Sequence, residues 1–121
     1  MKKEIKKSGF TLVEIMIVVM IIGLLAAIGI PNFLKARQNT LRKNAINNAR
    51  QVMSAVDEYA MENAVSGTNA VVTSAQYTPY IKGGVGGLDI GSTTATLSDV
   101  SPISNTNAVD LAKTMYPTIF Q

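Results

Sequence analysis

The residue types that usually carry out chemistry in proteins are sparse in this sequence. Its 121 residues contain no histidine and no cysteine, which removes the Ser-His-Asp triad, most zinc sites and thiol chemistry. Asp89, Asp99 and Asp110 are too scattered to match a calcium-binding loop, and the glycines around residue 85 do not have the spacing of a phosphate-binding loop. We therefore predict no enzyme activity, no metal site and no cofactor.

One acidic residue stands out because of its surroundings. Glu14 is the single charge in an apolar run from Phe10 to Pro31. This run is long enough to cross a membrane as a helix, since about 20 residues span the hydrocarbon core. A lone carboxylate at this depth costs about 2.5–3.5 kcal/mol on insertion scales. We interpret Glu14 as a functional residue that needs a positive partner.

A short basic segment precedes the apolar run. Residues 1–9 contain four lysines and end in Gly9, and the apolar run begins directly after them at Phe10. The string from Lys6 to Phe33 across this junction reads KKSGFTLVEIMIVVMIIGLLAAIGIPNF. This string resembles the N-terminal signature of type IV pilins and of type II secretion pseudopilins. A basic segment before an apolar run also occurs in ordinary secretory signal peptides. The Gly9-Phe10 junction and Glu14 favour the pilin-like interpretation.

The resemblance implies how the N-terminus is processed. In this family a membrane prepilin peptidase cuts after the glycine and N-methylates the new terminal amine. Carried over, residues 1–9 are a cytoplasmic leader, cleavage falls between Gly9 and Phe10, and Phe10 is N-methylated. The resemblance also implies that Glu14 meets the terminal amine of Phe10 in a neighbouring subunit, and that an inner-membrane assembly platform is a partner.

The leader also carries the whole excess of positive charge. The sequence has 11 Lys and Arg against 8 Asp and Glu, but seven of each remain from Phe10 onward. The mature chain would therefore be close to neutral, and its basic composition gives little support for nucleic-acid binding.

Small and helix-weakening residues occupy the second half of the apolar run. Gly23 and Ala27 have a spacing that lets two helices approach closely. Gly23, Gly29 and Pro31 all weaken a helix. The resemblance implies that the helix partly melts between Gly23 and Pro31 in an assembled filament. The alternative is a Gly/Pro pair that a membrane helix simply tolerates.

Residues 32–66 are predicted to form an amphipathic helix, ended by Gly67 as a left-handed cap. Apolar residues recur there at steps of three and four. They are Leu41, Ala45, Ala49, Val52, Val56 and Tyr59, followed by Asn63, with Ile46, Met53 and Ala60 widening the stripe. Cations lie between Lys35 and Arg50 and anions between Asp57 and Glu62. This separation suggests pairing between axially shifted neighbours, for example Arg50 with Glu58.

Residues 67–121 are predicted to form a small head. Gly91-Ser92 between two alternating runs is typical of a two-residue hairpin. In that register the side chains that pack on the amphipathic helix are Leu88, Ile90, Ala95 and Leu97. We also expect a short strand at Val71–Thr73 and a helix over Asn107–Met115, capped by Thr106 or Asn107. A final strand from Thr118 is the last expected element.

The expected fold is therefore α+β and pilin-like. A long N-terminal helix has a membrane-spanning half, 10–31, and an amphipathic half, 32–66, and it carries a small antiparallel β-containing head. The resemblance implies a structural subunit that is stored in the inner membrane, with its leader cytoplasmic and its head outside. That subunit is then polymerised into a surface or periplasm-spanning filament. The alternatives are a type II secretion pseudopilin and a membrane-anchored binding domain that never polymerises.

Overall fold

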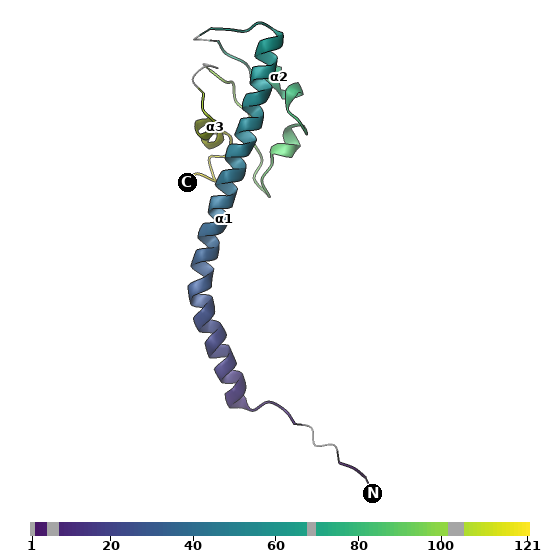
Figure 1. The fold of residues 1–121 in the computed structure, drawn as a ribbon, viewed down its shortest axis with the longest axis vertical. Helices are drawn as coiled ribbons and strands as arrows, with labels where there is room; N and C mark the ends of the chain where they lie inside the picture. The colour runs from purple at the N-terminus through teal and green to yellow at the C-terminus, as the bar shows by residue number, and fades with distance from the viewer. Residues whose placement is uncertain (1, 5–7, 68–69, 102–105) are drawn as a thin grey trace. The chain divides into compact units, whose positions relative to one another are not determined.

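The computed structural model of the chain describes residues 2–4, 8–67, 70–101 and 106–121. One long helix is followed by short helical segments (Figure 1). They are α1 (Leu12–Glu62), α2 (Ser74–Tyr77), the 3-10 helices η1 (Thr78–Tyr80) and η2 (Val85–Leu88), and α3 (Ala108–Met115). The chain divides into two compact units, residues 1–36 and 37–121. Lys6 and Lys7 of the predicted leader lie outside the described residues.

The first unit contains the apolar part of α1. Side chains from Leu12 to Leu34 are exposed, apart from the half-buried Ala26. The helix continues through Pro31 without interruption. By length and composition, α1 meets the requirements of a membrane-spanning helix in this part of the chain. An apolar helical surface of this size, uncovered by its own unit, calls for a nonaqueous environment or another helix.

The second unit is built on the amphipathic part of α1. The predicted stripe is confirmed at Ala45, Ala49, Val52 and Val56, which are buried in the core. Leu41 and Tyr59 pack against that core while partly exposed. Ala55 is also buried, which the predicted stripe omitted. Asn63, which was predicted to extend the stripe, is exposed because the helix ends one residue before it.

The end of α1 differs from the prediction. The backbone turns left-handed at Ala64, with φ of 53°, and not first at Gly67. The amide of Val65 donates to the carbonyl oxygen of Ala60 at 2.9 Å, which is the bond of a Schellman-type helix end. The prediction failed because glycine is the usual residue at such a position, whereas here alanine occupies it.

The head closes over one face of α1. α2 and α3 lie on opposite sides of α1 in Figure 1. The buried side chains that the head adds to the core are Val72, Tyr77, Ile81, Leu88, Ile90, Val100, Leu111, Ala112, Met115 and Tyr116. The predicted C-terminal helix is confirmed as α3. Its N-cap is Asn107, whose side-chain oxygen accepts from the amides of Val109 and Asp110 at 3.0 and 2.9 Å.

The predicted hairpin is only partly formed. The turn at Gly91-Ser92 is present, since Ile90 and Thr93 exchange two backbone hydrogen bonds of 2.9 and 3.0 Å, and Gly91 has a φ of 62°. The four side chains predicted to face the helix do belong to the core or pack against it. The pairing, however, stops after this single bridge, and the strands that we predicted on either side of the turn do not form.

The reason is competition for the groups that the next pair would use. In a two-residue hairpin Ala95 would donate to the carbonyl oxygen of Leu88. That oxygen instead accepts from the side-chain amide of Asn48, at 2.7 Å, and from the hydroxyl of Tyr116. The amide of Ala95 donates to the Asp89 carboxylate at 3.1 Å. Side chains have therefore replaced the strand ladder.

The other two predicted strands, at Val71–Thr73 and from Thr118, do not form either. Val71–Thr73 contributes one antiparallel bridge, between Val72 and Val100, and residues 117–119 form a turn. Among the described residues the head thus contains two isolated β-bridges and no strand of two or more paired residues. The confirmed part of the fold is a long N-terminal helix with a small C-terminal part.

One polar cluster ties the head to α1. The Asn48 amide donates to Leu88 and, at 2.9 Å, to the hydroxyl oxygen of Tyr116, which itself donates to Leu88. Burial raises the pKa of the Tyr116 phenol, while the hydrogen bond from Asn48 lowers it less. The hydroxyl therefore keeps its proton, and its role as donor, at neutral pH.

The helix end supplies a stability test. Replacing Ala64→Gly removes the steric cost of a left-handed alanine and should stabilise the second unit by about 1 kcal/mol. This corresponds to a rise of several degrees in the thermal midpoint, measured by circular dichroism on the full chain in detergent. The matched change Ala60→Gly, inside α1, should lower the midpoint instead. An unchanged or lower midpoint for Ala64→Gly would contradict the proposed helix end.

Candidate processing and assembly site

The candidate site lies where α1 begins. An exposed, non-helical segment precedes Leu12 and consists of Ser8, Gly9, Phe10 and Thr11. Among the described residues, and apart from Gly9 itself and its two chain neighbours, no atom lies within 4 Å of the position that a Cβ on Gly9 would take. The backbone around the predicted cleavage point is therefore uncovered by the described part of the chain, as a peptidase substrate requires.

Glu14 sits in the first turn of α1, and the helix start explains its position. Its carboxylate accepts from the backbone amide of Thr11 at 2.9 Å. In return, the amide of Glu14 donates to the hydroxyl oxygen of Thr11 at 3.3 Å. This reciprocal pair is a capping box, which satisfies two amide donors that a helix start leaves free.

The capping box also holds the Glu14 carboxylate where the helix itself stabilises a negative charge. The N-terminal end of a helix carries partial positive charge, which favours a carboxylate in its first turn. The cost of placing Glu14 in an apolar segment is thus partly offset within its own chain. A hydrogen bond from one neutral amide does not neutralise the carboxylate, so a positive partner is still favoured.

Thr11 is the site residue that the sequence analysis missed. The signal was present, because a threonine followed three residues later by glutamate, just before an apolar run, is the sequence pattern of a capping box.

The remaining predicted site residues lie inside α1. Gly23, Gly29 and Pro31 are all helical here. Apart from the chain neighbours and the backbone of the adjacent helical turns, a Cβ added at Gly23 or Gly29 would meet no described atom within 4 Å. Packing within the described chain therefore does not require glycine at either position. The predicted local melting concerns an assembled filament, so it stays a prediction.

The geometry at this helix start agrees with a known class of N-terminus. The prokaryotic N-terminal methylation motif matches residues 5–30, which include the predicted cleavage point and the capping box. The chain therefore carries the N-terminal signature shared by type IV pilins and type II secretion pseudopilins, and the resemblance predicted from the sequence is confirmed.

Individual relatives come from both branches of this class. The chain is 37% identical to type II secretion system core protein G of Vibrio cholerae over 78 residues, which are 60% of this chain and 53% of that protein. It is 34% identical to a fimbrial protein of Pseudomonas aeruginosa over 104 residues, 86% of this chain and 60% of that protein.

A third relative matches over a shorter stretch. The type IV major pilin protein PilA of Myxococcus xanthus is 44% identical over 57 residues, 47% of this chain and 26% of that protein. The chain spans about half the length of the type II secretion relatives that it matches. No solved structure matches.

The capping box can be tested directly. Thr11→Val keeps a similar side-chain shape but removes the hydroxyl that caps Glu14, and loss of such a cap typically costs about 1 kcal/mol. We expect the Cα chemical shifts of residues 12–14, measured by NMR on the full chain in micelles, to move toward non-helical values. Thr11→Ser should retain the helical shifts. Identical spectra for the valine variant and the wild type would rule out a stabilising cap.

Proposed function

We propose that this chain is the structural subunit of a type IV pilin-like filament. The observation that carries the proposal is the coincidence of two features in one segment. The N-terminal methylation motif at residues 5–30 covers the start of a helix whose apolar surface has no cover in its own unit. A filament core of parallel helices would cover that surface after the subunit leaves the membrane.

In this proposal a prepilin peptidase first removes the leader. Cleavage falls between Gly9 and Phe10, and the new terminal amine of Phe10 is N-methylated. The exposed backbone around Gly9 supports access for the peptidase. The subunit waits in the inner membrane as a single-pass protein with its head outside, held by residues 10–31. An assembly platform then moves it into a cell-surface or periplasm-spanning filament.

Glu14 guides assembly in the proposed mechanism. Its carboxylate, held at the helix start by Thr11, pairs with the terminal amine of Phe10 in a neighbouring subunit. Both charges are then buried among apolar side chains, where leaving one of them unpaired costs several kcal/mol. A subunit that enters at the wrong axial position leaves its charge unpaired, so the pair selects the correct position.

The weak points of α1 support the same proposal. Gly23 and Ala27 would let neighbouring helices approach closely. Packing within the described chain does not require glycine at position 23 or 29, which supports a role for these glycines in contacts between subunits. Gly29 and Pro31 would ease local melting of the helix during assembly. The antiparallel β character of the head also remains a proposal, supported by the two antiparallel bridges.

A type II secretion pseudopilin is the first alternative. The 37% identity to type II secretion system core protein G of Vibrio cholerae favours it, while the longer alignment with the fimbrial protein favours a pilus. A secretion defect on deletion of the gene would indicate the pseudopilin. An abundant surface fibre would indicate the pilus. In either case we propose a structural role and no enzyme activity.

The proposal is tested by intact mass and N-terminal sequencing of protein sheared from cells that express the chain. We expect a chain that begins at methylated Phe10 in the sheared fraction, because shearing releases fibres and leaves membrane-anchored monomers behind. Unprocessed protein that stays with the membranes would contradict the proposal. It would favour the second alternative, an anchored binding domain that does not polymerise.

Two substitutions at Glu14 separate its charge from its capping role. Glu14→Leu removes both, whereas Glu14→Gln removes the charge and keeps an acceptor for the Thr11 amide. We expect both variants to be processed and both to be missing from the sheared fraction, as measured by immunoblotting of sheared and membrane fractions. Normal fibres from the glutamine variant would show that the cap, and not the charge, is what assembly needs.

A further inference from the structure

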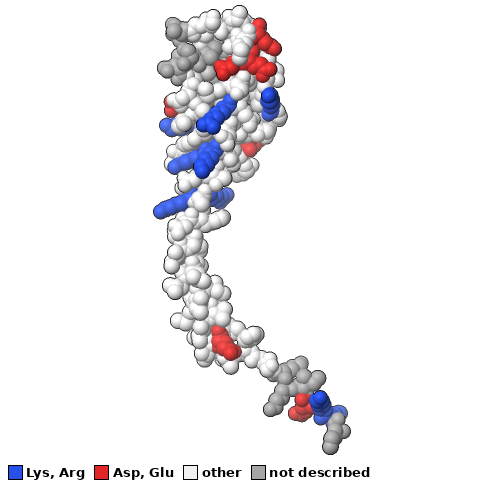
Figure 2. Space-filling view, in the orientation of Figure 1, with Lys and Arg blue, Asp and Glu red and all other residues white. Residues whose placement is uncertain are grey.

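The charges of α1 in the second unit are separated along the helix. Arg37, Arg42, Lys43 and Arg50 come first, and Asp57, Glu58 and Glu62 follow, all of them exposed. Figure 2 shows these cations and anions gathered in two separate bands. A helix that stabilised itself by charge would instead place opposite charges three or four residues apart.

These charges have almost no partners among the residues that the structure describes. In the described ranges there is a single ion pair, between Lys113 and Asp110 of α3, at 3.6 Å. Glu62 accepts a hydrogen bond from the hydroxyl of Tyr80. The four cations that α1 carries in the second unit and the carboxylates of Asp57 and Glu58 make no ion pair there, so both bands are available to another molecule.

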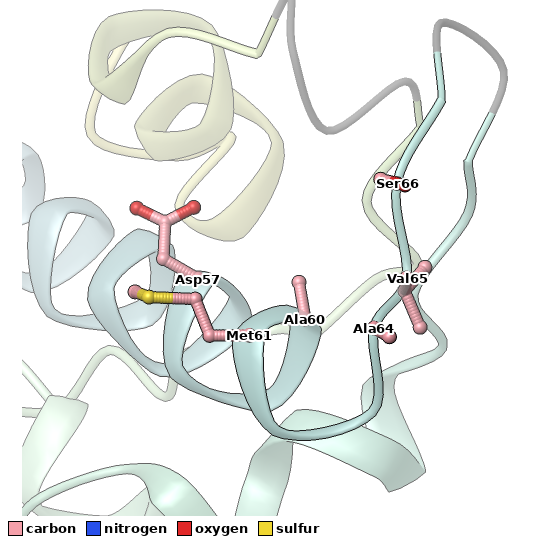
Figure 3. A pocket seen from close by; sticks show the side chains of 6 residues that line it. All are labelled: Asp57, Ala60, Met61, Ala64, Val65 and Ser66. Atoms are coloured by element: carbon pink, nitrogen blue, oxygen red, sulfur yellow. The ribbon is translucent and has the colours of Figure 1, made fainter.

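Several of these charges also share one face of the helix. Lys43, Asn47, Arg50, Ser54, Asp57 and Met61 recur at alternating steps of four and three. At about 100° per residue they form one ridge. This ridge lies roughly opposite the buried face of Ala45, Val52 and Val56. Figure 3 shows its upper end, where Asp57 and Met61 lie next to each other on α1 beside an open hollow.

We propose that this ridge binds a second copy of the chain, which lies parallel to the first and is displaced along α1. Lys43 of one copy lies beside Asp57 of the next. The displacement is about 14 residues, or about 21 Å along the helix axis. The proposal rests on the filament function, and it adds the residues that set the axial register of the exposed part of α1.

A smaller displacement along the ridge is disfavoured by the same charges. A displacement of about eight residues would pair Arg50 with Glu58, as the sequence suggested. It would also set Arg42 beside Arg50 of the neighbour, so that attraction and repulsion cancel. An antiparallel pair would bring opposite charges together as well, but it would send the two apolar N-terminal segments in opposite directions, which a shared membrane or filament core does not allow.

Exposed ion pairs are individually weak. Their contribution here is to discriminate between registers, because like charges placed side by side at an interface are penalised more than exposed opposite charges gain. The head leaves this ridge uncovered, so the charges can act during subunit addition without any rearrangement of the core.

A charge exchange tests the pairing. We expect Lys43→Glu and Asp57→Lys each to lower the yield of sheared fibre by about tenfold, and the double variant to restore most of the wild-type yield. The exchange Arg50→Glu with Glu58→Arg is the matched control and should not restore assembly. Failure of the first exchange to rescue, or rescue by the control exchange, would overturn the proposed register. Circular dichroism of each variant checks that these exposed changes leave the fold intact.

Cross-linking gives an independent measure of the register. Because the chain has no cysteine, Lys43→Cys with Asp57→Cys introduces two thiols and leaves Arg42 and Glu58 in place. A short bis-maleimide added to intact fibres should give a ladder of covalent multimers, and the pair Arg50→Cys with Glu58→Cys should not. Fibres without a ladder would refute this register and leave the filament function standing, whereas absence of wild-type fibres would refute the filament function itself.

Discussion

Everything in this chain depends on an apolar helix surface that its own unit does not cover. From Leu12 to Leu34 the side chains face outward, and water is a poor solvent for so much continuous hydrocarbon. The backbone of this segment satisfies itself as a helix, so it can move between a bilayer and a bundle of similar helices without exposing polar groups. The single carboxylate at its start, Glu14, is held in place by the capping box with Thr11.

The two halves of α1 follow different physical rules. The first half exposes an almost wholly apolar surface, with one carboxylate in its first turn. In the second half, an alanine-rich face binds the chain's own head, and the opposite, charged face stays open. One continuous helix therefore carries an uncovered apolar segment followed by a segment with one buried face and one charged face.

Much of this could be read from the sequence because it depends on local patterns. The apolar run, the stripe of Ala45 to Val56 and the Asn107 cap are periodic or short-range features. The hairpin strands failed because Leu88 bonds to Asn48 and Tyr116, which lie 40 and 28 residues away. No local pattern predicts that competition. The left-handed Ala64 is a residue that propensity argues against, and only the closing hydrogen bond of Val65 reveals it.

The Asn48–Tyr116 bond has a consequence for how the chain is made. Its partners are 68 residues apart, so the core of the second unit cannot close until the chain has been synthesised past Tyr116. During that interval the apolar face of Ala45 to Val56 has no cover, while the membrane-compatible part of α1 is already complete. Contacts that are distant in sequence form late, and a surface left open during synthesis is prone to aggregation. Keeping each nascent chain apart from its neighbours until Tyr116 has been synthesised is therefore a requirement of its biogenesis.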